Sequence, residues 1–200
     1  MLLAAGSGRR FGGPKALVDT GDGPWVLRAL ATLDGLDSRV VVTGAAAAEV
    51  AALLPGDVTA VHNPDHAGGM GSSLVAGLRA LDPGVDAAVV MLVDLPDVPA
   101  AAVHRVLRAA GLSAGQSWAG SNALALREAH DPEIRAALAR ATYHGRPGHP
   151  VLIGADHLPG VLASATGDRG ARDYLADHPV TAVECGDLAG GVDIDEPPGR

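Results

Sequence analysis

A glycine-rich segment near the start of the chain contains the first residues whose types and spacing could do chemistry. Ala4-Ala5-Gly6-Ser7-Gly8-Arg9 follows a short apolar run, and Lys15 comes six residues later. Gly6 and Gly8 allow the backbone to turn sharply and to bring its N–H groups close to phosphate oxygens. Arg9 and Lys15 add positive charge there. The segment therefore predicts a phosphate-binding loop.

The loop does not fit two common phosphate-binding motifs. A dinucleotide fingerprint needs a third glycine where Phe11 stands, and it needs an acid after the second strand, where Thr43-Gly44 is found. A P-loop needs Gly-Lys-Ser/Thr, but Pro14 precedes Lys15 and Ala16 follows it. Both alternatives fail on spacing.

Two further segments carry candidate residues. Val93-Asp94-Leu95-Pro96 closes an apolar run, and an acid at the carboxyl end of a buried strand is well placed to hold Mg²⁺. By position alone, Asp94 could equally be a turn residue before proline. Gly71-Ser72-Ser73 leads into a helix whose first N–H groups are free to bind an anion. The serines could also cap only their own helix.

Hydrophobic patterning predicts the elements that position these residues. Strands are expected at 1–5, 39–44, 58–62 and 86–93, and helices at 24–34, 46–54, 72–81 and 99–110. The runs 39–44 and 86–93 do not alternate in polarity, so both faces of their sheet should be covered. The repeated strand–helix order predicts an α/β fold with a doubly wound, mostly parallel sheet in three layers, as one domain over 1–200.

The second half of the chain is less regular. Asp131-Pro132-Glu133 predicts the start of a helix that continues through Ile134 and Leu138. Residues 145–150 read as a turn, 151–153 and 180–184 as strands, and Asp168 as the cap of a helix that contains Leu175.

Composition excludes some classes of partner. The formal net charge is −8, whereas a nucleic-acid backbone rewards clustered positive charge. The sequence has no apolar run near the roughly 20 residues that span a bilayer, and the N-terminus does not resemble a signal peptide. A lone cysteine, Cys185, suits a reducing compartment and reads as a small buried residue. We therefore expect a soluble cytoplasmic protein without nucleic-acid or membrane partners.

The segment from Leu3 to Leu17, with its Gly6-Ser7-Gly8-Arg9 and Pro14-Lys15 parts, resembles the signature of the MobA-like nucleotidyltransferases. The resemblance implies a Rossmann-like nucleotidyltransferase fold and transfer of a nucleoside monophosphate from a triphosphate, with release of pyrophosphate. It implies that Ala4, Ala5, Gly6, Ser7, Gly8, Arg9, Lys15, Gly71, Ser72 and Ser73 bind the nucleotide. Arg9, Lys15 and Asp94 would be catalytic, and Asp94 would hold Mg²⁺.

Other segments are similar to the molybdenum cofactor cytidylyltransferase branch of this family. Residues 63–74 resemble its second nucleotide-contacting segment, so CTP is the expected donor and a molybdopterin-type acceptor the expected partner. A molybdoenzyme that receives the product would be a further partner. Residues 143–151 and 167–172 resemble its acceptor side, which implies that Arg146, His149 and Arg169 bind the acceptor. Residues 192–197 resemble a terminal Asp-Ile-Asp segment, so Asp193 or Asp195 would supply a second metal carboxylate.

Some features depart from that branch and keep alternatives open. Residues 113–140 do not match that branch and look inserted beside the acceptor segment. The first strand is short, as if truncated. The final helix of the branch is missing. Residues 183–188 resemble NAD(P)H-dependent reductases of a quinonoid pigment, the nicotine blue oxidoreductase group, which gives a second hypothesis. A third hypothesis is a nucleotide-binding chaperone without turnover. The base of the nucleotide, the acceptor and the oligomeric state stay open.

Overall fold

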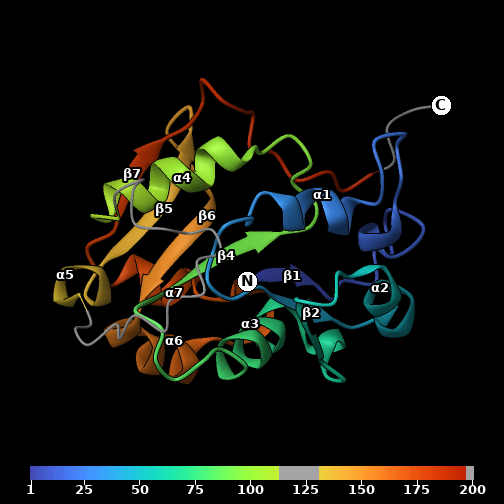
Figure 1. Ribbon diagram of the computed structural model, residues 1–200, viewed down its shortest axis with the longest axis horizontal. Coiled ribbons are helices and arrows are strands. Elements are labelled where there is room, and N and C mark those ends of the chain that lie inside the picture. Colours follow the sequence, from blue (N-terminus) through green and yellow to red (C-terminus); the bar gives the residue numbers. More distant parts are fainter. Residues whose placement is uncertain (113–130, 197–200) are drawn as a thin grey trace.

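A seven-stranded sheet forms the centre of the protein in the computed structural model, which describes residues 1–112 and 131–196 (Figure 1). The strand order is β3-β2-β1-β4-β6-β5-β7. The strands are β1 Leu2–Ala4, β2 Val40–Thr43, β3 Thr59–His62, β4 Ala87–Leu92, β5 Leu138–Tyr143, β6 Arg146–Gly154 and β7 Thr181–Glu184. β6 is antiparallel to both of its neighbours, and the other strand pairs are parallel.

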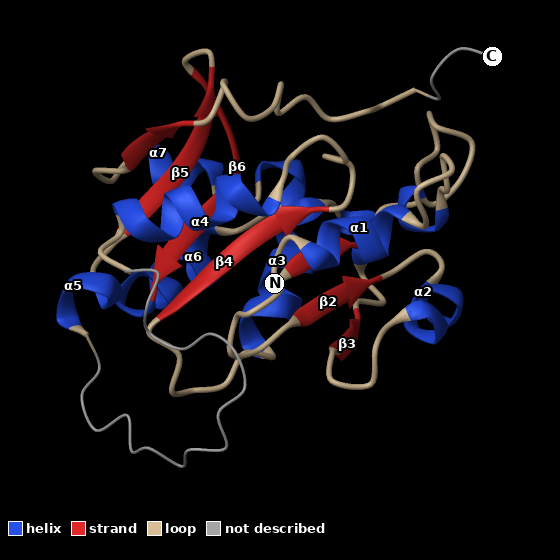
Figure 2. Ribbon diagram, turned by 45° about the horizontal axis from the view of Figure 1, so that its top comes forward, coloured by secondary structure: helices blue, strands red, loops and turns tan. Residues whose placement is uncertain are grey.

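Helices cover both faces of this sheet (Figure 2). One face carries α1 Trp25–Ala31, α2 Ala47–Leu53 and α4 Ala100–Ala109. The other carries α3 Met70–Arg79, α6 Leu158–Ser164 and α7 Arg172–Ala176, and the short α5 Pro132–Arg135 lies beyond the end of β6. Successive residues of a strand point to opposite faces of the sheet and pack in the two hydrophobic cores there. Leu2 packs under α1 and α4, whereas Leu3 packs toward α3. The expected three-layer, doubly wound α/β fold is confirmed.

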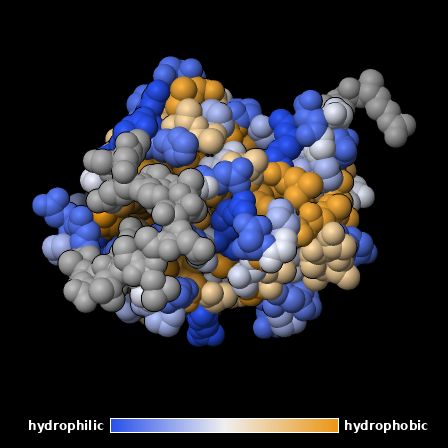
Figure 3. Space-filling model, viewed as in Figure 1, coloured by the Kyte–Doolittle hydropathy of each residue, from blue (hydrophilic) through white to orange (hydrophobic). Residues whose placement is uncertain are grey.

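The first half of the chain follows the predicted elements to within three residues at each end. β2 and β4 are buried on both faces, which explains why their apolar runs lack alternation. In the space-filling view, hydrophobic residues gather over α1 and α2 (Figure 3). α2 is rich in alanine and buries only Val50, so its small apolar side chains reach the surface.

Three predictions for the second half are wrong. The helix that starts at Pro132 ends at Arg135, and Leu138 begins strand β5 instead of continuing it. The expected turn at 145–150 is confined to His144-Gly145, and β6 already starts at Arg146. Asp168 caps no helix, because α7 begins at Arg172.

The physical reason is that pairing across the sheet overrides local preference. β5 lies between β6 and β7, so it is strand despite an alanine-rich sequence that favours helix. Pro147 and Pro150 lack an N–H donor, and they lie beside a register shift in β5 between Arg140 and Thr142. Proline within a sheet is tolerated at such irregularities.

The segment expected to be inserted, 113–140, lies largely outside the described residues. Its described part, 131–140, forms α5 and the beginning of β5, and is therefore built into the sheet. In the part of the chain that the structure describes, no helix is long and apolar enough to cross a membrane.

The C-terminal segment after β7 positions the last group of acidic residues. It crosses past the end of β4 toward the loop that follows β1 (Figure 1). The Ile194 N–H donates to the Asp94 carbonyl at 3.1 Å, and the Gly190 and Gly191 N–H groups donate to the Asp97 carboxylate at 2.9 and 3.1 Å. The chain end is thereby held against the carboxyl edge of the parallel strands, where ligands bind in such sheets.

Candidate active site

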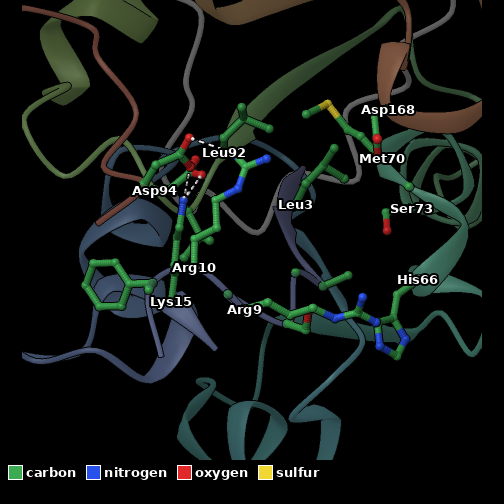
Figure 4. Close-up of a pocket in the computed structure, with 18 of the residues that line it drawn as sticks. Leu3, Arg9, Arg10, Lys15, His66, Met70, Ser73, Leu92, Asp94 and Asp168 are labelled. Carbon is green, nitrogen blue, oxygen red and sulfur yellow. Dashed lines mark hydrogen bonds and ion pairs between the residues drawn. The ribbon is translucent and has the colours of Figure 1, made fainter. Parts of the chain in front are cut away.

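A cavity of about 440 Å³ opens at the carboxyl ends of β1 and β4, and we call it the loop cavity. Its walls come from the loop after β1, the start of α3, the end of β4 and the C-terminal segment (Figure 4). Ala5, Gly6, Ser7, Gly8 and Arg9 all line it, as the sequence predicts. Ala4 instead packs in the core at the end of β1.

The glycine loop folds back on itself at Gly8. The Gly8 carbonyl accepts hydrogen bonds from the N–H groups of Gly12 and Gly13 at 2.9 and 3.1 Å. Gly8 has φ +57°, and a Cβ there would lie 1.8 Å from the Gly13 carbonyl oxygen. Only glycine fits this position without rebuilding the loop. At Gly6 a Cβ would meet nothing within 4 Å, so that position faces open space.

Lys15, the only lysine in the sequence, joins two of the predicted metal carboxylates. Its ammonium lies 3.0 Å from Asp94 Oδ2 and 2.9 Å from Asp195 Oδ1. Burial alone would lower the pKa of Lys15, but the hydrogen bonds and charges of Asp195 and Asp94 outweigh it and raise that pKa above its ordinary value. The same hydrogen bond, with the nearby charges, lowers the pKa of Asp195. Lys15 is therefore protonated and positively charged at neutral pH.

Asp94, Asp193 and Asp195 form a carboxylate cluster, with one oxygen of each lying within 4.8 Å of the others. Three carboxylates and the Lys15 ammonium leave a formal charge of −2, offset only in part by exposed Arg10, 3.7 Å from Asp195. Oxygen ligands at this spacing suit a hard divalent cation such as Mg²⁺ or Mn²⁺. The cluster is thus a possible acidic metal site, to which both Asp193 and Asp195 contribute.

Arg9, expected to act with Lys15 and Asp94, points elsewhere. Figure 4 shows Arg9 extending toward His66, while Arg10 and Lys15 gather around Asp94. His66 stands over Gly44, where a Cβ would lie 2.7 Å from the imidazole. The loop cavity therefore has a carboxylate end with Lys15 and a separate end with Arg9 and His66.

Residues 63–74, which the resemblance implies contact the nucleotide, are built around the buried Asn63. Its amide donates to the hydroxyls of Ser72 and Ser73 at 2.9 and 3.0 Å, and Ser72 donates to the Asp65 and Gly69 carbonyls. Ser73 lines the loop cavity, whereas Ser72 does not. Neither serine is a helix cap, because α3 starts at Met70 with Gly69 before it.

Gly71, also expected in the nucleotide site, has a packing role in this structure. A Cβ at Gly71 would lie 2.8 Å from the Thr166 backbone, so glycine allows α3 to approach the chain before α7. The residues of this segment that line the loop cavity are His66, Ala67, Gly69, Met70 and Ser73.

A second cavity of about 250 Å³ adjoins the loop cavity. Leu3, Met70, Leu92 and Asp168 line both. Asp195 faces the loop cavity and Asp193 the second cavity, so the carboxylate cluster lies where the two meet.

The predicted acceptor residues separate in space. His149 and Arg169 line the second cavity, but Arg146 lies exposed at the start of β6 and lines neither cavity. Burial, with a smaller effect of the Arg140 charge, lowers the pKa of His149 to about 4, so its imidazole is neutral at pH 7. Arg169 pairs with Asp173 at 3.2 Å.

Sequence reasoning missed several residues that build this site. Asn63 and His66 fall inside residues 63–74, which resemble a nucleotide-contacting segment, but the resemblance implied contacts only for Gly71, Ser72 and Ser73. Asp97 carried no signal in the sequence, because its partners at 190–191 lie more than 90 residues away. Asp168 falls within residues 167–172, which resemble the acceptor side, but nothing in the local sequence indicates that it lines both cavities.

Comparisons with known proteins agree with this geometry. The family profile described as the MobA-like NTP transferase domain matches residues 1–182. Nicotine blue oxidoreductase of Paenarthrobacter nicotinovorans is 34% identical over 98% of this chain and 90% of its own length. A crystal structure of a homologue of Mycobacterium tuberculosis Rv0371c, from Mycobacterium sp. strain JC1, has a TM-score of 0.75 at 28% identity, over 98% of this chain and 88% of that one.

A further solved structure, Rv0371c of Mycobacterium tuberculosis in complex with manganese, has a TM-score of 0.69 at 24% identity, over 96% of this chain and 91% of that one. At that identity it speaks for the fold alone. The family profile and the full-length relative together decide the assignment. The chain belongs to the MobA-like NTP transferase family.

Proposed function

We propose that this protein transfers a nucleoside monophosphate from a nucleoside triphosphate, with CTP favoured, to a phosphorylated acceptor such as molybdopterin, and that it requires Mg²⁺. One observation carries the proposal: the carboxylate cluster and Lys15 lie between two adjoining cavities. A donor in the loop cavity and an acceptor in the second cavity would meet at this point. CTP and the pterin acceptor rest on the sequence resemblance.

The reaction needs positioning more than proton transfer. An oxygen of the acceptor phosphate attacks the α-phosphorus, a new P–O bond forms, and the bond to the β-phosphate oxygen breaks so that pyrophosphate leaves. Since the nucleophile is already an anion, no general base is required. The cost of bringing two anions together is instead met by fixed positive groups and oriented N–H donors.

The residues of this chain divide that work. The N–H groups of the glycine loop and the free N-terminal N–H groups of α3 face the triphosphate. Lys15 stabilises charge on the phosphates, and Arg9 with His66 bounds the far end of the cavity. Asp94, Asp193 and Asp195 would hold the cation, which when bound neutralises phosphate charge during the transfer.

Removal of Asp94 tests the proposal. In Asp94→Asn, a variant of similar size, Mg²⁺-dependent pyrophosphate release from CTP with molybdenum cofactor as acceptor should fall by about 10³-fold or more, as for a group that anchors transition-state charge. The melting temperature should stay near that of the native protein, because Asp94 is partly exposed. Undiminished Mg²⁺-dependent release from the variant would overturn the assignment.

The reductase alternative is favoured by the similarity of this chain to nicotine blue oxidoreductase. The loop is against it, because Phe11 occupies the place of the third fingerprint glycine and packs against Trp25 with ring centroids 5.4 Å apart. Melting temperatures measured with CTP, GTP, ATP and NADPH, each with and without Mg²⁺, separate the hypotheses. A ligand at about 100 times its Kd adds roughly 2.7 kcal/mol to stability.

A Mg²⁺-dependent shift with one triphosphate would support transfer and identify the base. A shift with NADPH alone would support the reductase. Binding of a triphosphate without turnover on any acceptor would favour the nucleotide-binding chaperone. A cytoplasmic location is part of the same proposal, since triphosphate donors are abundant there.

A further inference from the structure

The end of the loop cavity that holds Arg9 and His66 has no ligand assigned to it by the transfer reaction. His66 begins the short 3₁₀-helix His66–Gly68 and is partly buried in the cavity wall. Figure 4 shows Arg9 extending to it, away from Lys15 and Asp94. Because the reacting phosphate of the donor lies beside Lys15 in the proposed reaction, another part of the nucleotide extends toward His66.

One hydrogen bond fixes which ring nitrogen of His66 carries the proton. Nδ1 lies 3.2 Å from the Asn63 carbonyl oxygen, and since a carbonyl can only accept, Nδ1 is the donor. In the neutral imidazole the other nitrogen, Nε2, then has a lone pair and no proton. Nε2 has no hydrogen-bond partner among residues 1–112 and 131–196. His66 therefore presents a hydrogen-bond acceptor to a ligand in the loop cavity.

The contacts of Asn63 hold this arrangement in place. The Asn63 backbone N–H donates to the Thr43 carbonyl at the end of β2, at 2.8 Å. Its side-chain amide donates to the hydroxyls of Ser72 and Ser73 in α3. The Asn63 carbonyl cannot turn away from His66 without breaking bonds to β2 and α3. The protonation of Nδ1, and with it the lone pair on Nε2, is thus set by the fold.

Arg9 supplies hydrogen-bond donors beside this acceptor. Within the part of the chain that the structure describes, its guanidinium forms no hydrogen bond and no ion pair, so its N–H groups are available to a ligand. The cavity end therefore offers one lone-pair acceptor and a set of donors. A lone pair repels phosphate oxygens, so this end fits the base of the nucleotide better than its pyrophosphate part.

The acceptor and the donors match one of the four common bases. Cytosine and adenine have an exocyclic amino group, which donates hydrogen bonds, whereas uracil and guanine have a carbonyl oxygen at the equivalent position. The Nε2 lone pair of His66 therefore fits cytosine or adenine. Of these two, only cytosine has a ring carbonyl on the same edge, to which Arg9 can donate, because adenine has a C–H group there.

We infer that His66 selects the base of the donor nucleotide: its Nε2 accepts a hydrogen bond from the amino group of cytosine, while Arg9 donates to the ring carbonyl. The inference rests on the proposed transfer reaction and makes His66 its specificity-determining residue. In UTP an oxygen replaces the amino group, so two lone pairs would face each other. A site that pairs with a polar group of its substrate rejects an analogue that cannot form the same hydrogen bond.

Calorimetric titration with CTP and with UTP, in the presence of Mg²⁺ and without an acceptor, tests the inference. The two nucleotides have the same charge and nearly the same shape. We expect the native protein to bind CTP at least about tenfold more tightly than UTP, as for one hydrogen bond lost at a partly buried acceptor. In His66→Gln, whose amide can turn to accept or to donate, the two affinities should differ by less than about twofold. The matched control is His62→Gln, altered at an exposed histidine of β3 outside the loop cavity, which should keep the native preference.

Two further measurements sharpen the test. Nitrogen-15 NMR of histidine-labelled protein reads the tautomer directly, and the His66 signals are those that His66→Gln lacks among the eight histidines of the chain. In the free protein we expect a protonated Nδ1 and an unprotonated Nε2, whose resonance shifts with CTP but not with UTP. Arg9→Met should weaken the binding of CTP more than that of ATP, which has no carbonyl for Arg9.

Three results would overturn the inference: equal binding of CTP and UTP by the native protein, an unchanged preference for CTP in folded His66→Gln, or a protonated Nε2 in the free protein. Equal weakening of CTP and ATP in Arg9→Met would assign Arg9 to the triphosphate and remove its part of the inference. If His66→Gln does not fold, the comparison of CTP with UTP on the native protein still decides.

Failure of the inference and failure of the proposed reaction give different results. The titrations need no turnover, so a clear preference for CTP without transfer to any acceptor would count against the proposed reaction alone. Binding of triphosphates without a preference for CTP would count against the role of His66 alone. Absence of binding by every triphosphate would overturn both.

Discussion

Replacement of Lys15 by methionine is expected to tighten binding of a divalent cation and, at the same time, to weaken nucleotide transfer. The Lys15 ammonium lies within 3.0 Å of oxygens of Asp94 and Asp195, the same groups that would hold the cation. A cation that enters the cluster therefore meets a positive charge already in place. Without that charge, only exposed Arg10 offsets the three carboxylates that face the cation.

The size of the effect follows from Coulomb's law. Two unit charges 4 Å apart interact by about 1 kcal/mol in water, so a divalent ion beside Lys15 is repelled by about 2 kcal/mol. We use the value for water because the Asp195 side chain is 53% exposed and solvent screens the cluster. A change of 2 kcal/mol corresponds to roughly 30-fold in Kd. We expect Lys15→Met to bind Mn²⁺ about 10- to 30-fold more tightly than the native protein.

The assay is a titration of the nucleotide-free protein with Mn²⁺, with free Mn²⁺ followed by electron paramagnetic resonance. Lys15→Arg, which keeps the positive charge, should bind Mn²⁺ nearly as the native protein does. Pyrophosphate release by Lys15→Met should fall by about 10²-fold, since the triphosphate loses its buried cation. An Mn²⁺ affinity that is unchanged or weaker in Lys15→Met would refute the reasoning.

The uniqueness of this lysine offers an independent check. Reductive methylation with ¹³C-formaldehyde labels Lys15 and the N-terminal amine only, because the sequence has no other lysine. If the ammonium leaves the carboxylates when a cation binds, the labelled Lys15 resonance should shift during titration with Mg²⁺. A resonance that stays fixed while the cation binds would show that Lys15 and the cation occupy the cluster together.

Three further predictions follow from the same structure. Gly8→Ala should lower the free energy of unfolding by more than about 1–2 kcal/mol and abolish nucleotide binding, because its Cβ would collide with the Gly13 carbonyl at a positive φ, whereas Gly6→Ala should leave the melting temperature unchanged. Asp97→Ala should release the C-terminal segment, seen as faster proteolysis after residue 186 and weaker Mn²⁺ binding; equal proteolysis of both proteins would contradict this. Hydrogen bonds from backbone N–H groups and a threonine lower the pKa of Glu184 to about 2, so the ionised carboxylate stabilises the fold. The melting-temperature difference between the native protein and Glu184→Gln should therefore be constant above about pH 5 and shrink as the pH falls from about 4.5 to 2.

Much of the candidate site could be predicted from the sequence, because its residues are neighbours along the chain. The glycine loop depends on φ values and close approaches within a span of six residues, from Gly8 to Gly13. The position of Asp94 at the end of a strand could be predicted because it follows an apolar run whose lack of polar alternation indicates a strand buried on both faces. Arg9 lines the loop cavity but lies toward His66, away from Lys15 and Asp94, since side-chain direction in a loop depends on the residues packed around it.

The sequence by itself determined the doubly wound α/β core, the turn of the glycine loop and the acid at the end of β4, because each is encoded by periodicity or by backbone demands of adjacent residues. The tertiary structure alone decided that β5 is a strand, that Asp97 anchors residues 190–191, and that Asp193 and Asp195 reach Asp94. It also decided that Arg140 and Arg172 line the second cavity while Arg146 stays outside. These contacts join residues tens of positions apart, and their free energy comes from pairing and burial that no local pattern contains.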